Sequence, residues 1–425
     1  MSTPAKSARR VAVIATGDEL VTGSFVDTNS AHIARALFER GYVVSRLCVL
    51  GDDEGGLVGT LAALADDHVG IVITGGLGPT LDDVTRHACA RAANVSLVRS
   101  EEVVAGLRQM FAQRGMSLPV TNERQALFPA GADVLPNAFG TAPGFVARLG
   151  TALVFALPGP PREMQPMLAS EVLPRLHAHA APAGSFARRR FYLHGLTESR
   201  FAELSGAWME RGAEPLLGVT SGRGILSATL VARAASDAEA ERSADVRAAE
   251  FRARFSRWIF SEDEPALELV LGRLLVERGL TVTIAESCTG GLVAERLTRV
   301  PGISAVLDAA FVTYANRAKT ELVGVEPALL ERHGAVSPQV AGAMALGAAS
   351  RARARLAIAV TGIAGPSGGT AEKPVGLVWC AVALDGRAQT EERRFAPLGR
   401  DLVREFACNA ALDLARRVVL ALGPV

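Results

Sequence analysis

The chain has 425 residues, which is too long for one ordinary domain and predicts about three. Hydrophobic residues make up 49% and aromatic residues 5%, so the core has to be built largely from Ala, Val and Leu, as in buried parallel sheets covered by helices. A formal net charge of +1 gives no reason to expect a nucleic-acid-binding surface or a polybasic membrane anchor.

The cysteines and the amino-terminal residues bear on the cellular compartment. The five cysteines are scattered and form no CxxC pair, so neither a disulfide framework nor a structural zinc site is expected. The apolar run after Arg10 stops at Gly17, which is too short for a signal peptide, and no later run is long enough to span a bilayer. We therefore expect a protein of the reducing cytoplasm without a membrane segment.

The first expected domain covers residues 1–175. Apolar strands alternate with amphipathic helices in the order βαβαβ, over residues 11–15, 29–40, 42–50, 57–65 and 70–73. This order predicts a parallel sheet, and ligands of such sheets bind beyond the carboxyl ends of the strands.

Acidic pairs follow the three strands, at residues 18–19, 52–53 and 82–83, beside a glycine-rich loop at 74–79. Several carboxylates at one edge favour a divalent cation, and bare loop amides favour phosphate. A plainer interpretation is that these are turn and cap residues. The predicted metal ligands are Glu19, Asp52, Asp82 and Asp83, and the predicted phosphate-binding residues are Thr74, Gly75, Gly76 and Gly78.

Residues 176–261 are expected to form a small connecting domain. The run 177–185 is typical of a linker, and the following order βαββαβ predicts a split α+β module. The arginines at 188–190 are interpreted as a solvated basic face, because no aromatic stacking residues interleave them. Connection or dimer assembly is the expected role.

In the last expected domain, residues 262–425, a buried strand at 280–284 precedes Ser287 and a helix at 292–297 follows it. A serine on a strand-to-helix turn is placed as a nucleophile, with the amides of Thr289, Gly290 and Gly291 facing a developing oxyanion. The plainer interpretation is that Ser287 or Thr289 caps the helix. Cys288 is the rival nucleophile.

Lys319 is the candidate base. Asn316 is placed to cap its helix, so the amine lies at the positive end of the helix dipole, where partial burial would lower its pKa further. Tyr314 is placed to orient the amine or relay a proton. His333 is the only histidine of this domain, so a serine–lysine pair is favoured over a triad.

A second glycine-rich loop, residues 361–369, repeats the TGxxGP spacing of the first one and is equally suited to phosphate. The predicted substrate-binding residues of this domain are Asn316, Thr361, Gly362, Gly365, Ser367 and Gly368. The patterns together predict an α/β fold, with two three-layer α/β domains of largely parallel sheets joined by the small split α+β domain.

Four motifs of the first domain, at residues 15–20, 74–83, 140–145 and 158–161, resemble the amino-terminal domain of the CinA (competence/damage-inducible protein) family. That domain is similar in fold to molybdopterin-binding enzymes, and the resemblance implies hydrolysis of ADP-ribose with a divalent Mg, Mn or Co ion. The sequence departs from the family at Asp18, where Thr is common. The extra carboxylate is expected to alter metal binding or to abolish pyrophosphatase turnover.

Motifs at residues 286–291, 314–319, 361–366 and 374–376 resemble the carboxy-terminal CinA domain, whose members are nicotinamide-nucleotide amidohydrolases. The resemblance implies conversion of nicotinamide mononucleotide to nicotinic acid mononucleotide and ammonia, without a cofactor. Ser287 would be the nucleophile, neutral Lys319 the base helped by Tyr314, and the 361–369 loop the holder of the 5′-phosphate. A homodimer that binds small nucleotides, and neither membranes nor nucleic acid, is expected.

Two alternatives remain open at this point. A competence or recombination factor could carry these motifs without catalysis, although the charge of +1 argues against DNA binding. The first domain could bind a pterin without hydrolysing a pyrophosphate.

Overall fold

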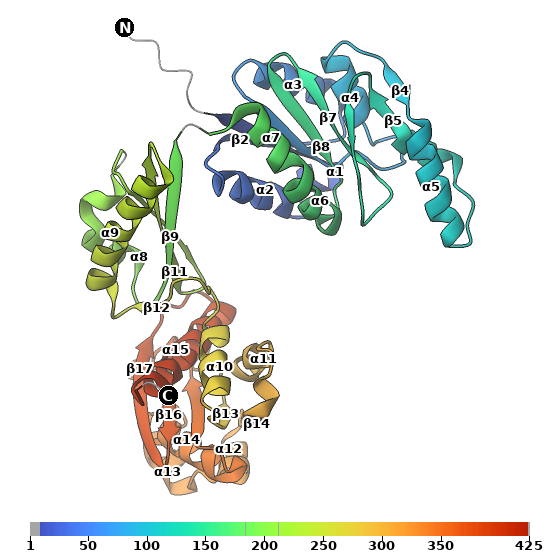
Figure 1. Ribbon diagram of the computed structural model, residues 1–425. Helices are drawn as coiled ribbons and strands as arrows, with labels where there is room; N and C mark the ends of the chain where they lie inside the picture. Colours follow the sequence, from blue (N-terminus) through green and yellow to red (C-terminus); the bar gives the residue numbers. More distant parts are fainter. Residues whose placement is uncertain (1–8, 183, 211, 424–425) are drawn as a thin grey trace. The chain divides into compact units, whose positions relative to one another are not determined.

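The computed structural model describes residues 9–182, 184–210 and 212–423. The chain divides into two compact units, Met1–Phe186 and Ala187–Val425 (Figure 1). The second unit contains two separate sheets, one built from strands before residue 262 and one from strands after it. The architecture is the expected mixed α/β fold.

The first unit is built on a six-stranded sheet of order β2-β1-β3-β8-β7-β6. The first four strands are mutually parallel, and β7 and β6 continue the sheet in antiparallel pairing. The strands are β1 (Arg10–Thr16), β2 (Val43–Leu50), β3 (Gly70–Thr74), β6 (Asp133–Leu135), β7 (Gly144–Leu149) and β8 (Ala152–Leu157). A separate two-stranded sheet pairs β4 (Leu97–Arg99) with β5 (Leu127–Pro129).

Alternating side chains of β1 enter two cores, as a sheet with helices on both faces requires. Val11 and Val13 join one core, and Ala12 and Ile14 join the other. The first core is covered by α2 (Thr28–Phe38), α6 (Pro161–Met167) and α7 (Leu173–Ala180), and the second by α3 (Glu54–Ala65) and α4 (Thr85–Ala92). The unit also contains α1 (Asp18–Val21) and α5 (Glu101–Gln113). The stretch expected as a linker from residue 177 instead begins inside α7.

The middle segment has the expected order βαββαβ. Its elements are β9 (Ser185–His194), α8 (Glu198–Ser205), β10 (Leu216–Gly222), β11 (Ile225–Ala234), α9 (Asp237–Phe255) and β12 (Ile259–Ser261). The strands form a sheet of order β10-β11-β9-β12. An aromatic cluster fills its core, in which the rings of Phe191 and Phe251 stack with centroids 4.4 Å apart.

The carboxy-terminal sheet has the order β14-β13-β15-β16-β17, and its first three strands are parallel. Its strands are β13 (Val282–Glu286), β14 (Leu307–Val312), β15 (Leu356–Gly362), β16 (Leu377–Leu384) and β17 (Arg387–Arg394). The helices are α10 (Leu267–Glu277), α11 (Leu292–Thr298), α12 (Asn316–Val323), α13 (Pro327–His333), α14 (Pro338–Ala352) and α15 (Arg400–Leu420).

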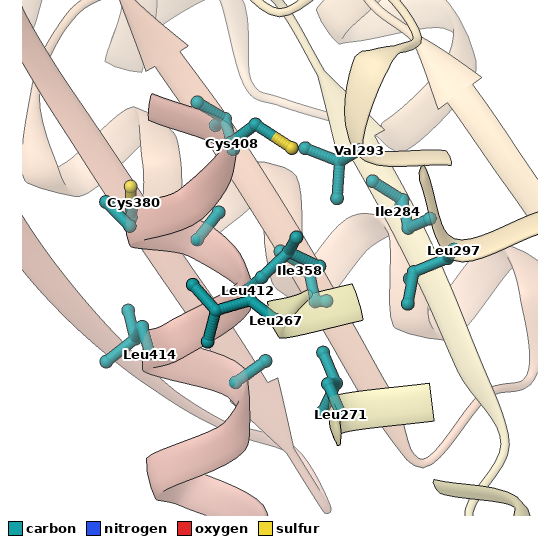
Figure 2. Close-up of a cluster of buried hydrophobic side chains, with 14 of the residues drawn as sticks. Leu267, Leu271, Ile284, Val293, Leu297, Ile358, Cys380, Cys408, Leu412 and Leu414 are labelled. Carbon is teal, nitrogen blue, oxygen red and sulfur yellow. The ribbon is translucent and has the colours of Figure 1, made fainter. Parts of the chain in front are cut away.

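The two faces of this sheet have different side chains. Large aliphatic residues such as Ile284 and Ile358 face α10, α11 and α15, and Figure 2 shows side chains of these elements converging in one cluster. The opposite face is mostly alanine, including Ala285 and Ala359, and packs against α14. Because β13 and β15 are adjacent and parallel, their carboxyl ends deliver the Ser287 turn and the residue 363–376 loop to the same edge.

Candidate active site

Ser287 begins the turn between β13 and α11. Its backbone N–H donates to the carbonyl of Val360 at 2.9 Å, which ties the turn to strand β15. Gly290 and Gly291 have φ angles of 61° and 99°, a backbone region that favours glycine. The strand-to-helix turn expected around the serine is therefore present.

Glu286 holds this turn in place. The residue is only 1% exposed, and its carboxylate accepts hydrogen bonds from the amides of Gly291 at 2.9 Å, Val293 at 3.1 Å and Ala294 at 2.9 Å. These amides belong to the helix start, where backbone donors lack helical partners. Glu286 therefore supplies the cap that was ascribed to Ser287 or Thr289. Its charge next to the N-terminus of a helix was the sequence signal for this role.

Two of the three amides expected to form the oxyanion site are already hydrogen-bonded within the protein. The N–H of Gly291 is bound by Glu286, and the N–H of Gly290 donates to the carbonyl of Ser287 at 3.1 Å. Both amides close the turn and are not available to a substrate, contrary to the prediction. Among the described residues, no hydrogen bond engages the N–H of Thr289, which is the remaining donor of the expected set.

The side chains of Lys319 and Ser287 contact each other in the protein interior. Lys319 is 1% exposed, and its Nζ lies 3.1 Å from Ser287 Oγ, 2.8 Å from the carbonyl oxygen of Thr313 and 3.3 Å from that of Tyr314. Carbonyl oxygens only accept hydrogen bonds. A neutral amine can donate both of its N–H groups to these carbonyls, and its lone pair then faces the serine hydroxyl.

The shifts in the pKa values of Lys319 and Cys288 agree with a neutral amine next to a serine nucleophile. Burial lowers the pKa of Lys319 below its ordinary value of 10.5, with a smaller opposing contribution from Cys288. Burial raises the pKa of the Cys288 thiol to about 12. The thiolate is the reactive form of cysteine, so a thiol that stays protonated at neutral pH is a poor nucleophile. The balance between the two candidate nucleophiles therefore favours Ser287.

Tyr314 is not positioned as a proton relay. Its hydroxyl accepts a hydrogen bond from the guanidinium of Arg400, and only its backbone carbonyl contacts Lys319. Arg400 also donates to the carbonyl of Gly365 at 2.8 Å. It therefore joins the Tyr314 segment to the second glycine-rich loop. Sequence analysis missed this arginine, because its position at the start of α15 gave no signal that it would meet residue 314.

Part of the second glycine-rich loop serves packing rather than binding. Thr361 is fully buried, and its hydroxyl donates to the carbonyl of Ala335 at 2.8 Å. A side chain at Gly362 would lie 2.6 Å from Val378, so this glycine allows a close approach of strands β15 and β16. These two residues, which were predicted to bind substrate, thus stabilise the fold instead.

Gly365 is buried as well, and its carbonyl accepts from Arg400 at 2.8 Å. The remaining predicted binding residues of this domain are accessible. Ser367 and Gly368 are exposed in the connection between β15 and β16. Asn316 is exposed as well, but it is the first residue of α12 and forms no capping hydrogen bond, since Ala315 occupies the cap position. The expected capping role of Asn316 is therefore corrected.

In the first unit, the expected residues come together around one pocket of about 690 Å³ at the carboxyl ends of the parallel strands. A side chain at Gly75 would lie 2.3 Å from the carbonyl oxygen of Thr16, so only glycine fits there. The pocket is lined by all the predicted ligands, namely Glu19, Asp52, Asp82, Asp83, Thr74, Gly75, Gly76 and Gly78.

The carboxylates of this pocket do not form the expected cluster. Asp83 accepts hydrogen bonds from the amides of Gly78 at 2.7 Å and Thr80 at 2.8 Å, so it stabilises the loop. Asp18 and Asp52 each accept from the other's backbone N–H at 3.1 Å. Among the described residues, no three His, Cys, Asp or Glu side chains are grouped to hold a metal. The described residues of the pocket therefore contain no preformed four-carboxylate site.

The pKa of Asp52 and the position of Glu163 also affect the chemistry of this pocket. Burial, opposed by hydrogen bonds from Asp18 and Thr16, raises the pKa of Asp52, and the charges of Asp18 and Glu19 add to the increase. Glu163 is 8% exposed, lines the pocket and accepts from Asn137 at 2.8 Å. Sequence analysis did not select Glu163, although it lies in the first turn of the helix after the Pro158–Pro161 loop.

Comparisons with known proteins match both ends of the chain. The family model described as "CinA C-terminal domain" matches residues 264–419, and the one described as "Probable molybdopterin binding domain" matches residues 12–178. A "CinA-like protein" of Geobacter sp. (strain M21) is 44% identical over 413 residues, covering 97% of this chain and 98% of that protein. A "Putative competence-damage inducible protein" of Symbiobacterium thermophilum is 40% identical over 95% of this chain and 97% of its own length.

Among solved structures, the competence/damage inducible protein CihA from Agrobacterium tumefaciens is 46% identical, with a TM-score of 0.35, and covers 36% of this chain and 96% of its own. The fold and the matched domains define a protein with a molybdopterin-binding-type α/β domain before a CinA carboxy-terminal domain. The near full-length relatives show more: the chain belongs to the CinA family. None of the described helices is both long and apolar enough to cross a membrane.

Proposed function

We propose that this chain hydrolyses the carboxamide of nicotinamide mononucleotide to nicotinic acid mononucleotide and ammonia. The observation that carries the proposal is the 3.1 Å contact between Lys319 Nζ and Ser287 Oγ, with two carbonyls placed to accept both protons of the neutral amine. Serine–lysine pairs are an established form of hydrolytic nucleophile and base. The choice of substrate rests on the resemblance of the carboxy-terminal motifs to nicotinamide-nucleotide amidohydrolases.

In the proposed reaction, neutral Lys319 takes the proton of Ser287 as Oγ attacks the carboxamide carbon. The oxygen of that carboxamide gains negative charge, which the N–H of Thr289 can stabilise. The C–N bond then breaks, and the leaving nitrogen takes the proton from Lys319 and departs as ammonia. Water, deprotonated by the same amine, attacks the resulting ester and releases nicotinic acid mononucleotide with Ser287 restored.

The test is ammonia release from nicotinamide mononucleotide by the full chain and three variants. Ser287→Ala and Lys319→Met should each lower kcat by at least about 10³-fold, because nucleophile and base act as a unit. Cys288→Ser is the matched neighbour and should keep most of the activity. Near-normal turnover by Ser287→Ala, or loss only in Cys288→Ser, would overturn the assignment.

We propose as a second activity that the first-unit pocket hydrolyses the diphosphate of ADP-ribose with divalent Mg, Mn or Co. In support, the oxygen donors Glu19, Asp52 and Asp82 line one pocket with the glycine loop. They are not grouped as a preformed cage. Magnesium is commonly held by one or two carboxylates together with substrate phosphates, and these residues fit that mode. The ion would neutralise phosphate charge, while the loop amides orient the diphosphate.

This second activity is tested by AMP formation from ADP-ribose with each metal in turn. Asp52→Asn and Asp82→Asn should lower AMP formation, whereas Ser287→Ala should leave it unchanged. Absence of AMP from the unaltered protein with all three metals would defeat the proposal. Because Asp18 is tied to Asp52, Asp18→Thr also tests whether the departure from the family pattern alters metal dependence.

Small nucleotides as ligands, a homodimer and a cytoplasmic location belong to the same proposal. Nucleic acid is not among the proposed ligands, because arginines of the middle segment are engaged by carboxylates of the protein itself. Arg189 pairs with Glu241 and Asp245, and Arg252 pairs with Glu262. Guanidinium groups held in this way contribute little to a nucleic-acid surface.

A further inference from the structure

The chain is very poor in lysine, which makes the position of each one informative. Of 45 Lys and Arg residues, three are lysines, namely Lys6, Lys319 and Lys373. Lys6 lies outside the described residues. Lysine and arginine are not interchangeable where a compact ammonium is needed. Lys319 is already explained by its contact with Ser287, so Lys373 is the lysine without an assigned role.

Lys373 lies on the same edge of the sheet as Ser287. It belongs to the connection that follows β15, and β15 is the parallel neighbour of the strand that ends before Ser287. A local turn fixes its backbone, in which Lys373 N–H donates to Thr370 Oγ1 at 3.1 Å and the Thr370 N–H donates to the Lys373 carbonyl at 2.8 Å. The lysine is thus held in place and not carried on a free loop.

Lys373 is half-buried, and among the described residues its ammonium has one hydrogen-bond acceptor. Nζ donates to the carbonyl of His333 at 2.6 Å. A side chain at Gly334 would lie 3.0 Å from Nζ, so this glycine leaves room for the ammonium. In the part of the chain that the structure describes, no carboxylate pairs with Lys373. An ammonium has three donors, so two remain for an anion.

The surrounding backbone is also suited to an anion. The same connection contains the glycine-rich residues 365–369, where Ser367 and Gly368 are exposed. His333, the acceptor of Lys373, is two residues before Ala335, whose carbonyl accepts from Thr361 at the end of β15. A continuous set of contacts therefore joins the Lys373 ammonium to the strand end beside Ser287.

We propose that Lys373 binds the phosphate of the mononucleotide substrate and makes this site select phosphorylated over unphosphorylated ribosides. This inference rests on the proposed amidase function and adds its specificity-determining residue. Lysine is a frequent phosphate ligand because it places a concentrated charge on the phosphate oxygens. Binding energy from a phosphate remote from the carboxamide can also be used to position the reacting carbon against Ser287 Oγ.

The test compares kcat/KM for nicotinamide mononucleotide with kcat/KM for nicotinamide riboside in the full chain. Lys373→Met should lower the ratio of the two values by about 10- to 100-fold, as expected for loss of one charged hydrogen bond, with the riboside value little changed. Lys373→Arg should restore part of the ratio. Arg351→Met is the matched charge control, because it lies at the end of α14 that leads into the opposite end of β15, and should leave the ratio unchanged.

The melting temperature separates binding from a structural role. An unchanged ratio in Lys373→Met, or an equal fall for both substrates together with a lower melting temperature, would overturn the proposal. If the unaltered chain releases no ammonia from either compound, the amidase function fails. Calorimetric binding of nicotinic acid mononucleotide then decides this inference separately. Weaker binding by Lys373→Met supports phosphate recognition, and equal binding by both proteins overturns it.

Discussion

At the scale of single residues, the unusual group is the Lys319 amine. It is enclosed by two backbone carbonyls and a serine hydroxyl, and no carboxylate is paired with it among the described residues. A buried ammonium without a counter-charge is costly, whereas a neutral amine in the same place is not. The environment therefore lets Lys319 lose its proton, and so act as a base, at a pH where most lysines remain protonated.

The first prediction concerns the pH dependence of ammonia release. Since burial lowers the pKa of Lys319, kcat/KM should rise with pH as the amine loses its proton and should level off below 10.5, the ordinary value. In that window the unfolded chain binds a proton that the native amine has lost, so the free energy of unfolding should also rise with pH.

A pH–rate profile between about pH 6 and pH 10 checks this expectation. Lys319→Arg serves as the control, because its guanidinium stays protonated throughout this range and should give no ascending limb. An activity that does not change with pH, or one that rises only above the ordinary lysine value, would contradict a neutral amine as the base.

At the scale of elements, the Ser287 turn is positioned by the carboxylate at the end of β13. Glu286 accepts from three amides of the turn and of α11, so strand, turn and helix are held by one side chain. Glu286→Gln should lower the free energy of unfolding by about 1.5–3 kcal/mol, the contribution of a hydrogen bond to a charged group. It should also lower kcat by about 10- to 100-fold through displacement of Ser287.

Urea unfolding and ammonia release measure the two effects. Glu295→Gln, on the same helix but paired at the surface with Arg299, is the matched control and should cost about 0.5 kcal/mol or less. Equal stability losses in both variants would mean that the Glu286 cap has no special role.

The sequence predicted elements best where apolar residues have a clear period. Strand β13 and helix α11 follow from the apolar run before Ser287 and the helical pattern after it. Strand β17, with the sequence RAQTEERR, has no apolar run, because an edge strand is paired on one side only and its side chains are mostly exposed. The pairing of Ser287 with Lys319 was predictable from two local motifs. The contact of Arg400 with Tyr314 spans 86 residues and has no local signature.

At the scale of the whole molecule, the second unit joins the middle segment to the carboxy-terminal domain through a buried ionic group. Asp413 of α15 accepts two hydrogen bonds from Arg416 and lies 3.5 Å from His194 of β9. Burial raises the pKa of Asp413, but His194 and Arg416 together outweigh it, and the pKa falls well below its ordinary range. This stabilisation is complete above the ordinary value of 3.8 and is lost as the pH falls toward the lowered one.

Asp413→Asn should therefore destabilise the protein by about 3–5 kcal/mol near neutral pH, because Arg416 would be left buried without its partner. Thermal unfolding of this variant and of Asp401→Asn gives the comparison, since Asp401 lies in the exposed first turn of the same helix. The difference between the two variants should shrink in acid. A constant difference down to about pH 2 would contradict the ionic explanation.

The absence of imidazole around Ser287 in the described structure has a pharmacological consequence. Alkylating agents that inactivate serine hydrolases through their histidine have no target beside this hydroxyl. A boronic acid needs only the hydroxyl oxygen, with which it forms a tetrahedral adduct. Under the proposed amidase function, boronates shaped like a nicotinoyl group are therefore the expected inhibitors.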